Sequence, residues 1–191
     1  MTINTIGPRE YKTLPIPNVV VINPTRYLSK PDGYVEETAD FTELSYFLEF
    51  KFEPRCTYII KSPKNIGRGG YLESRSKVIT VISGLIYLAL VDMRPRTDRG
   101  KTCELYLGIG KKSLGKSIVV PEGVITYYIP TSKSSLVHFT GNRPYNKFDS
   151  AKLLDMSDQA LGFHLPKGAI RHTPINETPK LLSLKDYLLT L

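Results

Sequence analysis

The three histidines of the chain are the first candidates for chemistry, because imidazole transfers protons near neutral pH and binds transition metals. They are His138, His164 and His172, and they stand far apart in the sequence. No two histidines lie one residue apart on a predicted strand, which is the spacing that many metal-binding β-barrels use. We therefore expect no bound transition metal and no cofactor, and each histidine is expected to be a surface or hydrogen-bonded structural residue.

Two other local features could carry chemistry. The stretch Gly67-Arg68-Gly69-Gly70 is rich in glycine, but it lacks the spacing of the loops that cradle phosphate, so we expect a plain turn. Cys56 and Cys103 are isolated thiols in a chain whose first residues do not resemble a secretory signal. Such cysteines are expected to be reduced core residues rather than a disulfide.

The charge of the chain favours an anionic partner. The 191 residues carry a formal net charge of +8, which suits phosphate-rich ligands, nucleic acids and membrane surfaces. Clusters of basic residues occur only at 94–101 and 111–116, without a helix-turn-helix, zinc-finger or aromatic RNA-binding signature. We therefore expect a solvated basic surface and no nucleic-acid partner. No run of 18 apolar residues exists, so a membrane partner and export are disfavoured and a cytoplasmic location is expected.

The scaffold that positions these residues is expected to be built from β-strands. A hydrophobic content of 41% is sufficient for one core, and short alternating or β-branched runs are separated by Gly and Pro. Ser83-Gly84 is expected to form the turn of a hairpin. The predicted strands are 18–22, 44–52, 77–82, 85–91, 102–107, 117–120, 124–129 and 135–140.

Three further segments have distinct patterns. In 44–52 apolar side chains occupy every second position, as in a half-buried strand that ends at Pro54. The segment 29–42 is the most loop-like part of the chain. Ser183 to Asp186 has the form of a capping box, which predicts a short C-terminal helix.

Eight pieces of sequence occur in an order and spacing that can be compared with a known family. They are 16–24, Arg68 to Tyr71, Lys77 to Gly84, Asp92-Met93-Arg94, Pro121-Glu122-Gly123, Tyr145, Leu154 to Asp158 and Leu182 to Asp186. Together they resemble the dTDP-4-dehydrorhamnose 3,5-epimerase family of small cupins. The resemblance implies an all-β fold, a double-stranded β-helix jelly-roll barrel with a short C-terminal helix. It also implies a single domain, with N-terminal strands and a loop in 1–55, the barrel in 56–166 and a C-terminal tail in 167–191.

In that family, a histidine held by an aspartate removes protons next to the C4 ketone of the sugar, and a tyrosine on the opposite face returns them. The positions that match the histidine and the tyrosine hold Tyr71 and Phe139, and Thr126 stands where the family has a second histidine. Asp158 and Lys77 keep their expected places. Because phenylalanine carries no proton, the resemblance implies an epimerase chemistry that is altered or lost.

The resemblance supplies a set of candidate site residues. If the protein is an active isomerase, Tyr71 and Asp158 would be the reactive groups and Lys77 would stabilise the enolate oxygen. The remaining candidates would bind the diphosphate, the ketone oxygen or the faces of the sugar and the base. These substrate-binding candidates are Arg68, Thr126, Phe139, Arg143 and Tyr145.

Two functions remain open at this point. The first is an enzyme of deoxysugar biosynthesis, serving cell-surface polysaccharides, that acts on a dTDP-4-keto-6-deoxyhexose. The second is a catalytically silent module that binds a nucleotide sugar or a glycan, or that serves as a structural partner. The resemblance also implies a homodimer with exchanged N-terminal strands, and the apolar run 19–22 is expected to need a partner to cover it.

Overall fold

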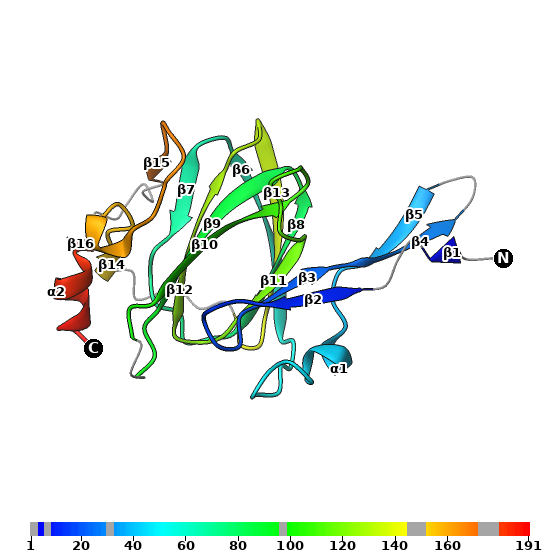
Figure 1. The fold of residues 1–191 in the computed structure, drawn as a ribbon, viewed down its shortest axis with the longest axis horizontal. Helices are drawn as coiled ribbons and strands as arrows, with labels where there is room; N and C mark the ends of the chain where they lie inside the picture. Colours follow the sequence, from blue (N-terminus) through cyan, green and yellow to red (C-terminus); the bar gives the residue numbers. More distant parts are fainter. Residues whose placement is uncertain (1–3, 6–8, 30–32, 96–98, 145–151, 172–179) are drawn as a thin grey trace.

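A computed structural model describes residues 4–5, 9–29, 33–95, 99–144, 152–171 and 180–191. Figure 1 shows two sheets that face each other. Together they form the jelly-roll barrel of the cupin fold. One sheet contains, in order, β2 (Glu10–Thr13), β3 (Val20–Asn23), β11 (Ser117–Val120), β8 (Lys77–Ser83), β13 (Ser134–Gly141) and β6 (Cys56–Pro63). The facing sheet contains β10 (Thr102–Gly108), β9 (Leu85–Asp92), β12 (Val124–Pro130), β7 (Ile66–Gly69) and β15 (Ile170–Arg171).

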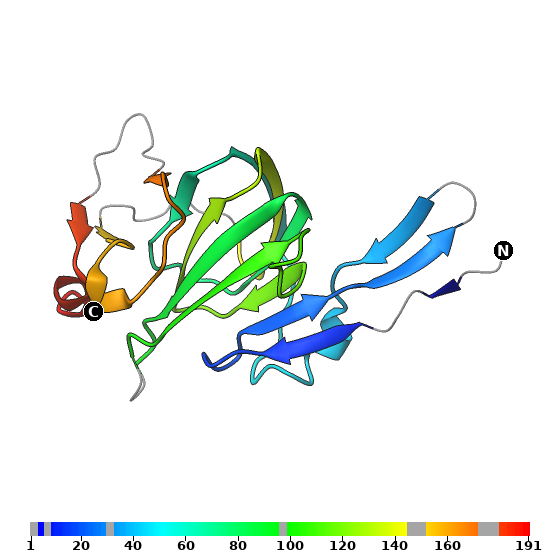
Figure 2. The same ribbon diagram turned by 45° about the horizontal axis from the view of Figure 1, so that its top comes forward.

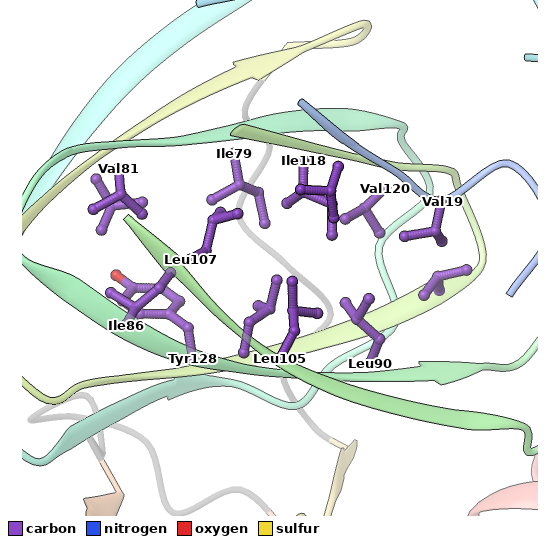
Figure 3. Packing of buried hydrophobic residues seen from close by; sticks show 14 of the residues in the cluster. Val19, Ile79, Val81, Ile86, Leu90, Leu105, Leu107, Ile118, Val120 and Tyr128 are labelled. Atoms are coloured by element: carbon purple, nitrogen blue, oxygen red, sulfur yellow. The ribbon is translucent and has the colours of Figure 1, made fainter. Parts of the chain in front are cut away.

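The space between the two sheets is filled by apolar side chains. Figure 3 shows Ile79 and Val81 from the first sheet pointing toward Ile86 and Leu105 from the second. All four are buried, and β-branched and aliphatic residues suit such a pleated interior. Such apolar runs are the pattern from which the strands are predicted. Seven of the eight predicted strands overlap a strand of the barrel.

The hairpin predicted at Ser83-Gly84 is wrong, because the two strands that it joins belong to different sheets. Strand β8 pairs with β11 and β13, whereas β9 pairs with β10 and β12. Gly84 has a φ of 85°, and a Cβ atom there would lie 2.6 Å from the Ser134 carbonyl oxygen. The chain therefore crosses from one sheet to the other at this glycine.

The strand predicted for 44–52 is also wrong. Leu44 is the last residue of α1 (Phe41–Leu44), whose Thr42 and Glu43 amides donate to the side chain of Asp40, and the rest of the segment contains neither helix nor strand. Leu44, Leu48 and Phe52 are buried against the outer face of the first sheet, while Tyr46 is 82% exposed. Apolar residues four positions apart satisfy an alternating pattern as well, so periodicity alone could not separate the two structures.

The segment 29–42, expected to be a loop, contains a strand. Strand β5 (Gly33–Glu37) pairs with β4 (Thr25–Ser29), and β4 pairs with β1 (Asn4–Thr5). We call these three strands the arm, and Figures 1 and 2 show that it projects away from the barrel. The ion pair between Glu36 and Lys116 connects the arm to the residue before β11.

The apolar run 19–22 does not need a partner to be covered. Val20 and Ile22 pack against Leu44, Leu48 and Phe52 of the same chain and are fully buried. Val19 and Val21 point into the barrel interior and are at most 1% exposed. The expectation that a second chain covers this run is therefore wrong.

The C-terminal segment covers the outer face of the second sheet. It contains β14 (Lys152–Leu154), a 3-10 helix η1 (Gln159–Leu161), β16 (Lys180–Leu182) and α2 (Leu184–Leu188). The predicted helix and its cap are confirmed, because the amide of Asp186 donates to the Ser183 hydroxyl over 3.1 Å. Tyr187 packs with Tyr127 and Leu154 in the cluster on this face. No helix in the described part of the chain is long and apolar enough to cross a membrane.

Candidate functional site

Lys77 and Thr126 meet inside the barrel. Lys77 begins β8 and Thr126 lies on β12 of the facing sheet, and the Lys77 ammonium donates to Thr126 Oγ1 over 2.8 Å. Lys77 is 2% exposed. Burial lowers the pKa of Lys77, and the nearby carboxylate of Glu73 opposes this decrease only in part. Two of the predicted site residues are thus brought together by strands from opposite sides of the barrel.

Glu73 is the centre of the charged group at this position, and the sequence reasoning missed it. It lies in the loop between β7 and β8, and one carboxylate oxygen contacts the Lys77 ammonium. The other oxygen accepts a hydrogen bond from Arg75 Nε over 2.7 Å. Burial alone would raise the pKa of Glu73, but the charges of Lys77 and Arg75 outweigh it and hold the pKa below its usual value.

A signal for this cluster is present in the sequence. Glu73, Arg75 and Lys77 stand at every second position up to the start of β8, whose first five residues are buried on both faces. An extended chain places such residues on the same side, which would bring their charges together. Charged residues in a loop are normally exposed, however, so the alternation alone does not predict that these three residues are buried.

Aromatic residues extend the charged cluster into the barrel. Arg75 donates to the Tyr58 hydroxyl over 2.7 Å. The ring of Tyr58 stacks on Phe139 of the neighbouring strand, with 4.9 Å between the ring centroids. The ring of Tyr128, on β12 of the facing sheet, has its centroid 6.0 Å from that of Phe139. Phe139, predicted to contact substrate, is therefore packed in an aromatic group and is 5% exposed.

Arg68 is connected to the same group through two hydroxyls. Its Nε donates to Ser62 Oγ over 2.8 Å, and Ser62 shares a 3.3 Å hydrogen bond with the Tyr128 hydroxyl. Strand pairing sets this geometry, since Arg68 on β7 is directly opposite Tyr128 on β12. A continuous path of contacts thus joins Lys77 to Arg68 along the interior.

Arg143 lies at the rim of the barrel, beside the loop that carries the charged cluster. Its guanidinium donates to the Ser74 carbonyl oxygen over 2.7 Å and lies 3.2 Å from a carboxylate oxygen of Glu122. Ser74 is the exposed residue between Glu73 and Arg75, and Glu122 belongs to the turn between β11 and β12. Arg143 is therefore an exposed cation at the end of the barrel nearest to Lys77.

Asp158 holds two helix ends together. Its carboxylate accepts hydrogen bonds from the amide of Leu184 over 2.7 Å and the amide of Ala160 over 3.0 Å. These two bonds lower the pKa of Asp158. They place it at the N-termini of α2 and η1 in the C-terminal segment, and its catalytic role stays a prediction.

Tyr71 lies in the loop between β7 and β8 and interacts with a residue of β15. It is half-buried and interacts electrostatically with Arg171, whose guanidinium lies 5.6 Å from the centroid of the Tyr127 ring. Arg171 also donates to the Gly69 carbonyl oxygen over 2.8 Å. The role of Tyr71 as a base stays a prediction, and Tyr145 lies outside the described residues.

The glycine-rich stretch is not a plain turn, because Ile66–Gly69 forms strand β7. A Cβ atom at Gly67 would lie 1.9 Å from the Tyr127 hydroxyl, and one at Gly69 would lie 2.1 Å from the Thr126 carbonyl oxygen. Glycine is required here because β12 passes too close for any side chain. The stretch thus lets Arg68 approach the strand that carries Thr126.

The remaining chemistry-bearing residues lie elsewhere. His138 is half-buried on β13, where burial lowers its pKa, and exposed His164 contacts Glu104 over 2.8 Å. His172 falls outside the described residues. Cys56 and Cys103 are free thiols. Within the described ranges, no three His, Cys, Asp or Glu side chains are grouped closely enough to hold a metal ion.

The sequence matches no protein-family model, and no curated protein matches it. Solved structures do share its fold. The dTDP-4-dehydrorhamnose 3,5-epimerase from Elizabethkingia anophelis is 20% identical, with 93% of this chain and 97% of that chain covered and a TM-score of 0.76. RmlC from Streptococcus suis, solved with dTDP-D-xylose, is 18% identical over 94% of this chain and 97% of that chain, with a TM-score of 0.74.

A third structure extends the comparison. The dTDP-6-deoxy-D-glucose-3,5-epimerase RmlC from Legionella pneumophila, in complex with dTDP-4-keto-L-rhamnose, is 19% identical. The match covers 94% of this chain and 90% of that chain, with a TM-score of 0.71. At these identities the likeness concerns the fold, and the chain has the cupin jelly-roll fold of the dTDP-4-dehydrorhamnose 3,5-epimerases.

Proposed function

We propose that the protein binds a nucleotide-linked deoxysugar of the dTDP-4-keto-6-deoxyhexose type at the end of its barrel that holds Lys77, as an epimerase-like protein of deoxysugar biosynthesis. The contact between Lys77 and Thr126 carries this proposal, because it places an ammonium and a hydroxyl from facing sheets where a ketone or phosphate oxygen can be bound. Two structures with the same fold contain dTDP-sugars, dTDP-4-keto-L-rhamnose and dTDP-D-xylose. The exposed cation Arg143 at the rim suits an incoming anion.

We further propose that the epimerase chemistry is altered or lost. Phe139 occupies the position expected for the proton-returning tyrosine, and its ring stacks on Tyr58 and carries no ionisable group. The carboxylate nearest to Lys77 is Glu73, which two cations hold in its ionised form. Loss of one positioned acid or base commonly slows a reaction by about 100-fold to 10,000-fold.

The alternative function is a silent module that binds a nucleotide sugar or a glycan, or a structural partner. The pairing of Glu73 with both Arg75 and Lys77 favours it, because a carboxylate stabilised in this way is a weak base. The two functions share a ligand-binding barrel and differ in whether a proton leaves the sugar.

Thermal melting with nucleotide sugars tests the binding that both functions require. At a ligand concentration of about 100 times Kd, binding stabilises the folded state by about 2.7 kcal/mol. For a chain of this size we expect a rise in melting temperature of about 5–10 °C with dTDP or a dTDP-4-keto-6-deoxyhexose. The control is a simple salt without phosphate groups at equal ionic strength. Melting temperatures that equal that of this control with every nucleotide would refute the proposal.

Solvent deuterium exchange then separates the two functions. Incorporation of deuterium at C3 or C5 of the bound 4-keto sugar would establish proton abstraction, and the product would be followed by NMR. Binding without exchange would establish the silent module. A Tyr71→Phe variant shows whether that phenol takes part, since its loss would abolish exchange but leave the thermal shift.

We also propose that the protein is a homodimer, with the arm as the element that contacts the second chain. Figure 2 shows the arm extending beyond the barrel, and Tyr34 and Val35 on it are 54% and 61% exposed. Exposed apolar residues on a projecting strand pair are commonly covered by a partner. We expect light scattering to give twice the mass of the chain and a Tyr34→Ser, Val35→Ser variant to give a monomer. The expected cytoplasmic location, the lack of a nucleic-acid or membrane partner, and the division of the chain at 55 and 166 stay predictions.

A further inference from the structure

Lys77 and Thr126 offer hydrogen-bond donors that their described contacts do not use. An ammonium has three N–H donors, and within the described residues those of Lys77 are directed to Glu73 and to Thr126 Oγ1. The Thr126 hydroxyl accepts the bond from Lys77, so its own hydrogen is left to donate. One N–H and one O–H donor are therefore adjacent, in a buried position on strands of facing sheets.

Glu73 differs from these two residues because it does not belong to a strand. Lys77 and Thr126 lie on strands, whereas Glu73 lies in the irregular loop between β7 and β8. Its carboxylate contacts the Lys77 ammonium from this loop, and its side chain is 8% exposed. The neighbouring residue Ser74 is exposed at the rim and accepts a hydrogen bond from Arg143. The carboxylate thus reaches Lys77 from a loop whose next residue is exposed.

We propose that Glu73 is an internal substitute for an anionic ligand, and that its carboxylate occupies the place that Lys77 and Arg75 offer to an oxyanion of the phosphate or carboxylate type. The oxygens of Glu73 meet the same donors that a phosphate oxygen would meet, an ammonium and a guanidinium. An incoming oxyanion therefore competes with Glu73 for Lys77. For the identity of the natural ligand this inference rests on the proposed function.

The competition is tested by removing the charge of Glu73 and measuring the binding of pyrophosphate by calorimetry at fixed ionic strength. Glu73→Gln keeps the size of the side chain and removes its charge, so we expect pyrophosphate to bind about tenfold more tightly than to the wild-type protein. Glu53→Gln is the matched control, because Glu53 also bridges a lysine and an arginine, Lys51 and Arg55, but on the exposed surface. An affinity of Glu73→Gln equal to that of Glu53→Gln or of the wild type would overturn the proposal.

Two more variants keep the test decisive. The double variant Glu73→Gln, Lys77→Gln removes the cation for which ligand and carboxylate compete, and we expect it to lose the gain in affinity. Glu73→Asp keeps the charge and shortens the side chain by one methylene, so it applies if Glu73→Gln does not fold. It should bind pyrophosphate more tightly than the wild type, and wild-type affinity would overturn the proposal.

The outcome is separable from that of the proposed function, because pyrophosphate contains neither a sugar nor a base. A gain in pyrophosphate affinity without a thermal shift from any nucleotide sugar would refute the proposed function and support the competition. A thermal shift with dTDP-sugars in the wild type, without any gain in Glu73→Gln, would refute the competition alone.

Discussion

At the scale of single residues, the site is defined by a carboxylate that pairs with two buried cations. Glu73 contacts Lys77 with one oxygen and Arg75 with the other. Removing one partner of a buried ion pair commonly costs about 3–5 kcal/mol, because a charge is left without compensation. The protonation of Glu73 is therefore expected to affect the stability of the whole barrel.

The contribution of Glu73 to the stability of the folded protein is expected to be lost in acid. The usual pKa of Glu73 is 4.5, and Lys77 and Arg75 hold it lower in the folded protein. A carboxylate with a lowered pKa stabilises the folded state above its unfolded pKa, and this contribution is lost as the pH falls through the folded value. Below pH 4.5 we expect the melting temperature of the wild-type protein to decrease more steeply than that of Glu73→Gln.

Other carboxylates titrate in both proteins and cancel in the comparison. Glu36, Glu104 and Asp158 also have lowered pKa values, caused by hydrogen bonds to neighbouring side chains or amides that offset burial. The difference between the two melting profiles therefore reports on Glu73. Parallel profiles below pH 4.5 would mean that its ion pairs contribute nothing to stability.

The structure brings together several of the residues that the resemblance implied, and their roles in binding or reaction stay predictions. Lys77, Thr126, Phe139 and Arg68 were expected to bind or to react, and the structure joins them by contacts along the barrel interior. Glu73 was missed, because charged residues in loops are normally exposed and the alternation of Glu73, Arg75 and Lys77 does not by itself show that they are buried. That burial results from long-range pairing of the strands on either side of the loop.

At the scale of elements, the segment 44–52 shows how one apolar pattern can fit two structures. In a strand, Tyr46 and Leu48 would lie on the same face. In the structure Leu48 is 8% exposed and packs on the first sheet, whereas Tyr46 is 82% exposed. Mutation of these two residues distinguishes the alternatives.

Leu48→Ala is expected to lower the free energy of unfolding by about 2–5 kcal/mol, because it leaves a cavity against β3 and β11. Tyr46→Ala is expected to change it by less than about 0.5 kcal/mol, since the ring is exposed. Urea unfolding followed by circular dichroism measures both. Similar losses for the two variants would show that 44–52 forms a strand with both side chains buried.

At the scale of the whole molecule, the sequence predicted the barrel but not how its strands divide between the sheets. The apolar runs of β8, β9 and β12 marked the strands, because β-branched, aromatic and other apolar residues suit a pleated buried surface. The partners of a strand depend on contacts between distant residues, and no local pattern at Ser83-Gly84 reveals that β8 and β9 separate there.

The wide separation in sequence of the paired strands in the first sheet has a consequence for how the protein folds during synthesis. In the first sheet Ile22 pairs with Ser117, and Cys56 pairs with Gly141. Strands made early must therefore wait, with their apolar faces uncovered, until most of the chain has left the ribosome. Such distant pairings make folding slow, on a timescale of about milliseconds to seconds. The nascent chain is thus most exposed to aggregation, and most dependent on chaperones, before β11 and β13 emerge.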